Sequence, residues 1–240
     1  MSIKRYTLGP FKKLVFLGGG ELLWRLSQWT QAMGLELAVI TSPRHSVDKI
    51  YGMTLEKLLI EHATEFHITE KLDNSFLSKV VSDPDHTFSL SLGAAWVFNE
   101  QLINDVFKGN LFNMHGTRLP QNRGGGGFSW QILTGNKFGF CNIHKLEAGI
   151  DVGEIIFSKE YLFPDSCRTP AQFNAVYIER AFGFLTEYFT KLSSSAQDVY
   201  PLSQPEYLSS YWPRLNTEVN GWIDWGWTSI HLERFICAFD

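Results

Sequence analysis

Three polar residues have the chemistry and spacing that acyl transfer requires: Asn113, His115 and Asp151. Asn113 and His115 stand two positions apart at the end of an apolar segment, so a strand would place both side chains on one face. A histidine can take or give a proton near neutral pH, and an asparagine amide can donate to a developing oxyanion. A carboxylate beside the histidine would fix its tautomer and stabilise its charged form. Together these groups could transfer an acyl group without a metal ion or a covalent intermediate.

Each of these residues also has a structural explanation. A single histidine at the end of a strand can serve only as a hydrogen-bonding residue of the core, and Asn-x-His is a short motif. Asp151 lies in the sequence EAGIDVGEII, and an aspartate in a turn can simply hydrogen-bond the nearby backbone. The glycines at positions 149 and 153 and the apolar flanks indicate a tight turn between two buried strands, which favours a functional carboxylate there.

Alternating strands and helices are expected to position these side chains. The expected strands fall within residues 12–20, 35–41, 65–69, 86–93 and 109–114, and the expected helices within residues 21–33, 54–63, 74–82 and 99–107. Asn99 is a plausible N-cap for the last of these helices. Such alternation predicts an α/β fold with an open parallel sheet covered by helices.

The pattern changes after residue 127. A short helix over residues 129–135 precedes two strands, 137–147 and 153–162, whose short connection predicts an antiparallel hairpin. A long helix over 169–192 follows, with Thr169 as N-cap and Pro170 at its first position. Residues 193–198 are expected to form a surface linker, and residues 228–238 one more helix. We therefore expect a catalytic domain over 1–192 and a C-terminal helical and aromatic extension over 193–240, packed on or near the core.

Two further features could bind an anion. Gly18, Gly19 and Gly20 follow the first strand, where backbone N–H groups and a helix N-terminus often hold phosphate, although the same glycines could form only a tight turn. The loop lacks the last glycine of the dinucleotide-binding motif. Arg44 follows the second strand, and ligands of open sheets lie beyond the carboxyl ends of the strands. Arg44 could therefore meet an anionic group or remain a solvated loop residue.

Composition narrows the function classes. The chain has 240 residues, a net charge of −4 and 3 cysteines. Without a long basic run, a nucleic-acid partner is not expected. An odd cysteine number without paired spacing argues against a disulfide framework. We expect no signal peptide and no membrane span, hence a cytoplasmic protein, and the spacing of the 7 histidines predicts no metal site.

The segments FNMHGTRLPQNRGGGG and GIDVGEII resemble the signature of the folate-dependent formyltransferases. This family includes glycinamide ribonucleotide, methionyl-tRNA and nucleotide-linked sugar formyltransferases. The resemblance covers roughly residues 11–161 and is strongest over 89–157. Gly116 stands where many members have proline, and Gly124–Gly127 fill a loop that is often shorter. These departures, with SLGAAWVF and the tryptophan-rich C-terminal segment, are more typical of the sugar N-formyltransferase branch.

The resemblance implies a Rossmann-like, mostly parallel sheet with an antiparallel hairpin at one edge, and 10-formyltetrahydrofolate as formyl donor. It assigns catalysis to Asn113, His115 and Asp151. The folate-contacting residues would be Leu92, Gly93, Ala94, Trp96, Ile150 and Gly153. The residues expected to contact the acceptor are Arg44, Gly116, Arg118, Arg123 and Gly125.

The implied acceptor is the primary amine of a nucleotide-linked amino sugar, such as dTDP-4-amino-4,6-dideoxyglucose, in the synthesis of lipopolysaccharide O-antigen. The implied mechanism is direct attack of the amine through a tetrahedral intermediate, and a homodimer is expected. Two alternatives stay open. The chain could formylate another small amine, of the glycinamide ribonucleotide or methionyl-tRNA type, or it could be a non-catalytic protein that binds folate or a nucleotide sugar.

Overall fold

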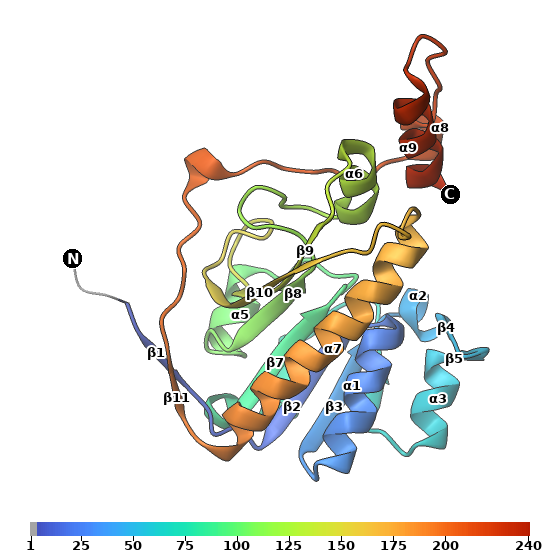
Figure 1. Ribbon diagram of the computed structural model, residues 1–240. Coiled ribbons are helices and arrows are strands. Elements are labelled where there is room, and N and C mark those ends of the chain that lie inside the picture. The colour runs from blue at the N-terminus through green and yellow to red at the C-terminus, as the bar shows by residue number, and fades with distance from the viewer. Residues whose placement is uncertain (1–3) are drawn as a thin grey trace.

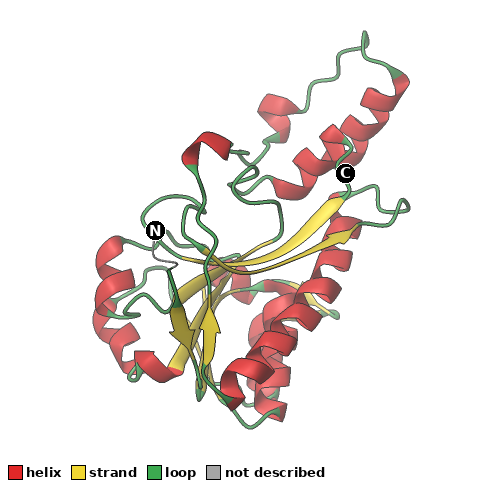
Figure 2. Cartoon of the chain, turned by 60° about the vertical axis from the view of Figure 1, so that its left-hand side comes forward, coloured by secondary structure: helices red, strands yellow, loops and turns green. Residues whose placement is uncertain are grey.

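The computed structural model describes residues 4–240 and places a central sheet between helices on both of its faces (Figures 1 and 2). The strands are β1 Tyr6–Leu8, β2 Lys13–Gly18, β3 Glu36–Thr41, β4 Lys49–Ile50, β5 Met53–Thr54, β6 Phe66–Ile68, β7 Thr87–Leu92, β8 Leu111–His115, β9 Phe138–Lys145, β10 Ile155–Leu162 and β11 Gln197–Val199. The α-helices are α1 Gly20–Ala32, α2 Pro43–Ser46, α3 Leu55–Glu61, α4 Asn74–Val80, α5 Glu100–Asp105, α6 Gly127–Thr134, α7 Pro170–Ser194, α8 Thr217–Asn220 and α9 Ser229–Phe239. Two short 3₁₀ helices are η1 Pro84–His86 and η2 Glu206–Leu208.

Within the described residues, the main sheet has 7 strands in the order β10-β9-β8-β7-β2-β3-β6. The strands from β8 to β6 run parallel, whereas β9 is antiparallel to β8 and β10 is antiparallel to β9. This confirms the predicted α/β class with an antiparallel hairpin at one edge. The strand order reverses between β2 and β7, and the carboxyl ends of two such strands border the crevice in which open sheets bind ligands.

Alternation along the strands builds an apolar layer on each face of the sheet. On one face, Phe16 and Phe88 are fully buried and pack in a cluster with residues of α1 and α7. On the other face, Val15 and Leu17 pack with residues of α4 and α5. Fully burying side chains of this size contributes about 1.5–3 kcal/mol each. The sheet is therefore held rigidly from both sides, which fixes the loops at its carboxyl edge.

Local signals in the sequence mark several helix starts. The Asn99 side chain accepts a hydrogen bond from the Leu102 N–H at 2.8 Å, which confirms the predicted N-cap of α5. Thr169 forms a capping box with Gln172 at the start of α7, and Pro170 occupies the first helical position as expected. Each such cap contributes about 1 kcal/mol because it satisfies backbone N–H groups that the helix leaves unpaired.

The predicted surface linker over residues 193–198 is wrong in part. The last turn of α7 extends to Ser194, and Gln197 and Asp198 belong to β11, which pairs with β1 in antiparallel register. The sequence pattern does not reveal β11 because this strand is polar and short and pairs with one other strand. The division into domains at residue 192 stays a prediction.

Beyond β11 the chain returns across the top of the sheet toward α6 (Figure 1). We call residues 202–214 the C-terminal strap. Its Leu202 forms an antiparallel bridge with Ile155 at the start of β10. Farther along, Trp212 donates its N–H to the Arg123 carbonyl at 2.7 Å and its carbonyl accepts from the Gly126 N–H at 3.3 Å. The strap thus joins the hairpin to the glycine run 124–127.

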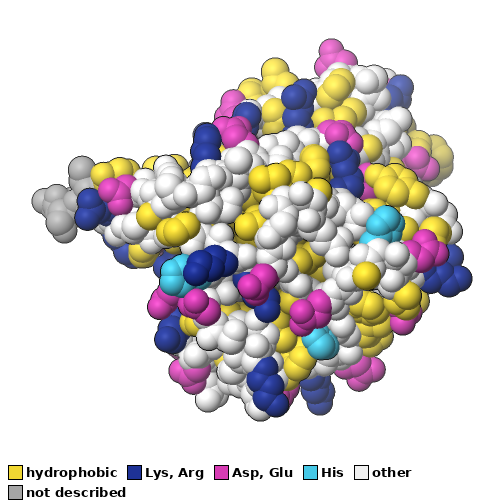
Figure 3. Space-filling view, turned by 90° about the horizontal axis from the view of Figure 1, so that it is seen from below, with side chains coloured by type: hydrophobic (Ala, Val, Ile, Leu, Met, Phe, Trp, Pro, Cys, Tyr) yellow, Lys and Arg dark blue, Asp and Glu magenta, His cyan; other side chains and the backbone are white. Residues whose placement is uncertain are grey.

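Charges of both signs are interspersed on the face seen in Figure 3, with hydrophobic side chains between them. None of the helices in residues 4–240 has the length and apolar character needed to cross a membrane. Over the same residues, no cluster of histidine, cysteine and acidic side chains could hold a metal ion.

Candidate active site

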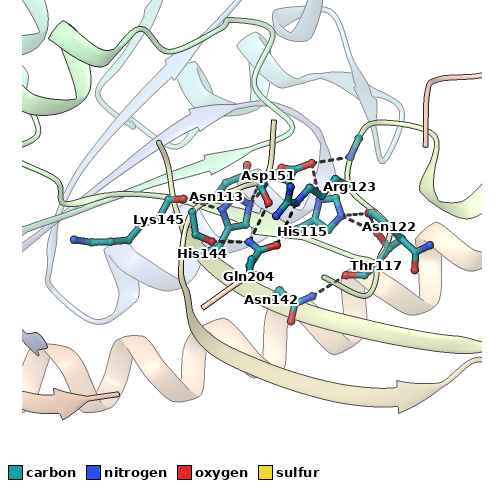
Figure 4. A network of polar contacts seen from close by, with 12 residues as sticks. Asn113, His115, Thr117, Asn122, Arg123, Asn142, His144, Lys145, Asp151 and Gln204 are labelled. Atoms are coloured by element: carbon teal, nitrogen blue, oxygen red, sulfur yellow. Dashed lines mark hydrogen bonds and ion pairs between the residues drawn. The ribbon is translucent and has the colours of Figure 1, made fainter. Parts of the chain in front are cut away.

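The three predicted catalytic residues meet at the carboxyl edge of the sheet (Figure 4). Asn113 and His115 extend from the end of β8, and Asp151 enters from the loop between β9 and β10. One Asp151 carboxylate oxygen, Oδ2, lies 3.5 Å from Nδ1 of His115. The other, Oδ1, lies 3.3 Å from Nδ2 of Asn113. The fold therefore brings together groups that are 38 residues apart in the chain.

The His115 ring is oriented by groups of its own loop. Its Nε2 atom lies 2.8 Å from the carbonyl oxygen of Asn122 and 2.7 Å from the hydroxyl oxygen of Thr117. Since a carbonyl oxygen can only accept, the proton resides on Nε2, and Nδ1 carries the lone pair in the neutral ring. The sequence led us to expect that Asp151 fixes this tautomer. The Asn122 carbonyl faces Nε2, and the Asp151 carboxylate, which also can only accept, faces Nδ1, where it can stabilise the charged ring.

His144 is a fourth member of the site that the sequence did not predict. Antiparallel pairing sets Asn113 opposite His144 and His115 opposite Asn142. The His144 ring is completely buried, and its Nδ1 donates to the Lys145 carbonyl at 2.8 Å. Its Nε2 therefore carries the lone pair and accepts from Nδ2 of Asn113 at 3.1 Å. Oδ1 of Asp151 lies 3.3 Å from the same nitrogen. His144 thus determines how the Asn113 amide is held.

Asp151 is the most constrained residue of the site. Its φ of 53° lies in the left-handed region, which is uncommon for residues other than glycine but tolerated by aspartate. Its Oδ2 accepts the Gly124 N–H at 2.9 Å, so the carboxylate also reaches the glycine run. Burial by itself would raise the pKa of Asp151. The neighbouring His144 and His115 rings and the Gly124 N–H outweigh burial and hold that pKa well below its usual range.

The pKa of His115 moves in the direction that keeps the ring neutral. Burial lowers the pKa of His115, and the nearby Asp151 carboxylate opposes that shift only in part. A neutral ring with the proton on Nε2 has a basic Nδ1 facing the carboxylate. The site can therefore accept a proton at Nδ1 and stabilise the resulting positive charge.

A cleft leads from these residues to the start of α1. The cavity next to His115 has a volume of about 360 Å³ and is lined by Gly93, Gly116, Tyr177 and the glycine run 124–127. A second cavity of about 180 Å³ is lined by Gly19 and Gly20 at the helix start. Gly93, Met114 and Tyr177 line both cavities, so the two cavities adjoin at the switch point of the sheet, and we call them together the cleft. Tyr177 was not predicted, because its helix α7 shows only a repeating apolar pattern.

The predicted acceptor contacts separate into two groups. Gly116 and Gly125 line the cleft. Arg44 is exposed on α2, with a guanidinium nitrogen 2.9 Å from Nε2 of His45. Arg118 is exposed but is not among the residues that line the cleft. Arg123 is buried and its guanidinium pairs with Glu206 of the C-terminal strap at 2.7 Å, which makes it a support of the site. The contacts of these residues with an acceptor stay predictions.

The predicted folate contacts differ in exposure. Gly93 and Ile150 are exposed, whereas Ala94 and Trp96 are half-buried. The Leu92 side chain belongs to the apolar core. Leu92 lines the smaller cavity beside Gly19 and does not line the cavity next to His115.

Gly153 is buried where a Cβ would collide with the Lys145 carbonyl, so close packing of the turn explains this glycine. All six folate assignments stay predictions.

The glycine run is packed against the protein itself. A Cβ at Gly124 would lie 2.5 Å from the Trp212 carbonyl oxygen, and one at Gly126 would lie 2.6 Å from the Trp130 ring. At Gly127 it would lie 2.7 Å from a Thr117 methyl group. Only Gly125 has space, with the Arg214 side chain 3.7 Å away. At the other three positions, glycine therefore permits close approach of the strap and of neighbouring side chains.

Several known formyltransferases share this architecture. No family model matches the chain. It is 23% identical over 231 residues to the methionyl-tRNA formyltransferase of Clostridium perfringens, which covers 93% of this chain and 72% of that protein. The solved sugar 3-N-formyltransferase WlaRD, determined with dTDP and 5-N-formyl-tetrahydrofolate, matches with a TM-score of 0.75 at 19% sequence identity. The match includes 95% of this chain and 79% of the WlaRD chain. The chain has the formyltransferase fold.

A second structure with this formyltransferase fold is the N-formyltransferase of Helicobacter canadensis, in complex with folinic acid and dTDP-3-aminofucose. It has a TM-score of 0.72 at 19% identity and covers 95% of this chain and 80% of its own. Sugar N-formyltransferases are thus among the structural neighbours, as the sequence resemblance indicated. The formyltransferase fold explains why the Asn-x-His strand, the glycine run and the Asp151 turn meet at one edge.

Proposed function

We propose that this protein is a sugar N-formyltransferase, which transfers a formyl group from 10-formyltetrahydrofolate to the primary amine of a nucleotide-linked amino sugar. One observation carries the proposal: Asn113 and the ionised Asp151 meet at His115, and His115 lines the cleft. Their groups provide a hydrogen-bond donor, a proton acceptor and a fixed negative charge, which is what acyl transfer to an amine needs.

The residues at the carboxyl edge of the sheet fit a folate donor. Ala94, Trp96 and Leu146 pack against the same apolar cluster, so the segment after β7 and the loop after β9 border one region. Within residues 4–240, the backbone N–H groups of residues 94–98 donate to no backbone acceptor and remain available to a polar ring edge. We assign the folate to Leu92, Gly93, Ala94, Trp96, Ile150 and Gly153. When bound there, 10-formyltetrahydrofolate would supply an electrophilic formyl carbon.

The protein's own groups would then act in sequence. Nδ1 of His115 takes a proton as the amine attacks, because the Asn122 carbonyl keeps Nε2 protonated. The protonated ring donates a hydrogen bond to the oxygen that becomes negative, and the Asn113 amide does so with the N–H that it otherwise directs at Asp151. Asp151 stabilises the charged His115 ring from 3.5 Å. As the bond between the formyl carbon and the folate nitrogen breaks, the ring would return its proton to that nitrogen, and tetrahydrofolate would leave. One such donor lowers the barrier by about 3 kcal/mol.

Two arginines near the far end of the cleft support an acceptor with a diphosphate, and the acidic side chains of Glu21 and Asp48 lie at the same end. His45 lies against Gly19, the N-cap of α1, because a Cβ on this glycine would be 2.5 Å from the His45 Cβ. Arg44 contacts this histidine, and Arg214 reaches over Gly125 from the strap. In the described chain neither arginine is paired with a carboxylate. Two free guanidinium groups and a helix start are suited to bind phosphate.

The structural neighbours with bound dTDP and dTDP-3-aminofucose support a thymidine-linked sugar. We take dTDP-4-amino-4,6-dideoxyglucose as the first acceptor to test, and a role in O-antigen synthesis and a homodimer as parts of the proposal. The similarity to a methionyl-tRNA formyltransferase makes methionyl-tRNA the comparison substrate.

Thermal unfolding with a panel of ligands tests the acceptor class. A ligand that binds only the folded protein raises the Tm, by an amount that depends on its concentration relative to Kd. We expect dTDP-linked 4-amino and 3-amino sugars to raise the Tm and an Arg44→Ala, Arg214→Ala double variant to lose most of this shift. If methionyl-tRNA or glycinamide ribonucleotide raises the Tm and no nucleotide sugar does, the proposed acceptor is wrong.

A further inference from the structure

The turn that carries Asp151 needs support from outside itself. Asp151 has a left-handed backbone conformation, which costs about 1–2 kcal/mol in a residue with a side chain. The turn is also crowded, because Gly153 abuts the Lys145 carbonyl. If the turn relaxed, the carboxylate would leave the position from which it contacts His115, His144 and the Gly124 N–H.

Gln204 of the C-terminal strap holds the backbone of the turn that carries Asp151 (Figure 4). Its Nε2 donates to the carbonyl oxygen of Asp151 at 2.9 Å and to that of Gly153 at 2.6 Å. A primary amide has two N–H groups, and both are used on carbonyls that flank the turn. The two contacts fix the Asp151–Val152 and Gly153–Glu154 peptide groups, and with them the direction of the Asp151 side chain.

The Gln204 amide is itself held in one orientation. Nε of Arg123 lies 3.4 Å from Oε1 of Gln204, and the same guanidinium pairs with Glu206 at 2.7 Å. An arginine has no acceptor, so Oε1 must face it and both N–H groups must face the turn. Arg123 also precedes Gly124, whose N–H holds the Asp151 carboxylate at 2.9 Å. Residues 123 and 124 therefore fix the position of the Asp151 carboxylate directly. Through Gln204 they also fix the position of the backbone that carries it.

We propose that Gln204 is a positioning residue of the reaction: its amide keeps the Asp151 carboxylate beside Nδ1 of His115. Gln204 contacts the backbone of Asp151 and of Gly153, and its effect on turnover passes through the position of the Asp151 carboxylate. The inference deepens the proposed function, because the importance of Asp151 for turnover rests on that proposal. The position of Asp151 relative to His115 can nevertheless be measured without any substrate.

A substitution that removes the donors and keeps the length of the side chain tests this role. Gln204→Met loses both N–H groups, whereas Gln197→Met changes a glutamine of β11 whose side chain hydrogen-bonds only to Ser195. The Asp151 charge favours the protonated His115 ring. NMR titration should therefore show a lower His115 pKa in Gln204→Met than in the wild type, and an unchanged pKa in Gln197→Met. Hydrogen exchange in the wild type should show protected Gln204 side-chain N–H groups.

Turnover provides the second readout. We expect kcat of Gln204→Met to fall about 10- to 100-fold with KM values within about threefold, because misplaced catalytic groups affect the chemical step most. A wild-type-like His115 titration in Gln204→Met, or Gln204 side-chain N–H groups that exchange as fast as those of Gln197, would overturn the proposal. If the wild type formylates no sugar but the His115 titration shifts as expected, the proposed function fails and the positioning role stands.

Discussion

Asn113 and His144 face each other across the β8–β9 pair, with Nδ2 of Asn113 3.1 Å from Nε2 of His144. This contact joins the predicted hydrogen-bond donor to a buried ring whose other nitrogen is already committed to the Lys145 carbonyl. The Asn113 amide is thereby held in one orientation before any substrate binds. Preorganised donors of this kind are the main electrostatic contribution to catalysis in many enzymes.

Loss of Asn113 or His115 should remove most turnover while the fold survives. Asn113→Ala deletes a donor to the developing oxyanion, and His115→Asn deletes the basic Nδ1. Each should lower kcat by about 100- to 1,000-fold, the effect of one oxyanion donor. Steady-state kinetics with circular dichroism as the folding control measures both. Near-normal turnover of either purified variant contradicts the catalytic assignment.

Replacing His144 should affect both stability and turnover. In His144→Leu, the Lys145 carbonyl and the Asn113 amide each lose a buried partner, and an unsatisfied buried group costs about 1–3 kcal/mol. We expect this loss in urea unfolding and a fall in kcat, because the Asn113 amide becomes free to rotate. His231→Leu, on the exposed start of α9, is the matched control. Equal effects in the two variants would argue against a role for His144.

Stability should fall on acidification in two steps. The folded-state pKa of His115 is lowered, so the unfolded chain binds its proton first and stability decreases as the pH falls below about 6.5. The folded-state pKa of Asp151 is also lowered, so its carboxylate stabilises the fold above about pH 4 and this contribution is lost at lower pH. Urea unfolding from neutral to acidic pH should show the first step in the wild type and a smaller one in His115→Asn. Identical pH profiles would contradict the shift of His115.

The glycine run gives a test of packing against flexibility. Gly126→Ala would collide with the Pro213 carbonyl and the Trp130 ring, whereas a Cβ at Gly125 meets only Arg214 at 3.7 Å. We expect Gly126→Ala to lower the free energy of unfolding by about 1–3 kcal/mol and Gly125→Ala to change it by less than about 0.5 kcal/mol. Similar free energies of unfolding for the two variants would contradict the close packing at Gly126 and indicate a flexible loop.

Much of the fold could be predicted because local and long-range signals agree. The apolar strands and caps such as Asn99 and Thr169 mark elements whose periodicity is strong, and the Asn-x-His spacing on a strand correctly brings both side chains to one face. Contacts that depend on tertiary pairing left no local signal. His144 is a buried histidine within an apolar strand, and only the β8–β9 register shows that it faces Asn113. Gln204 lies 53 residues from Asp151 in an irregular segment, where no periodicity could indicate its contact.

Mass spectrometry of the reaction product tests the central claim most directly. Purified protein would be mixed with 10-formyltetrahydrofolate and dTDP-4-amino-4,6-dideoxyglucose, with His115→Asn as the inactive control. We predict a nucleotide sugar heavier by one CO unit, formed by the wild type and nearly absent with the variant. An unmodified sugar in both reactions, while methionyl-tRNA or glycinamide ribonucleotide is formylated by the wild type, would contradict the proposed function.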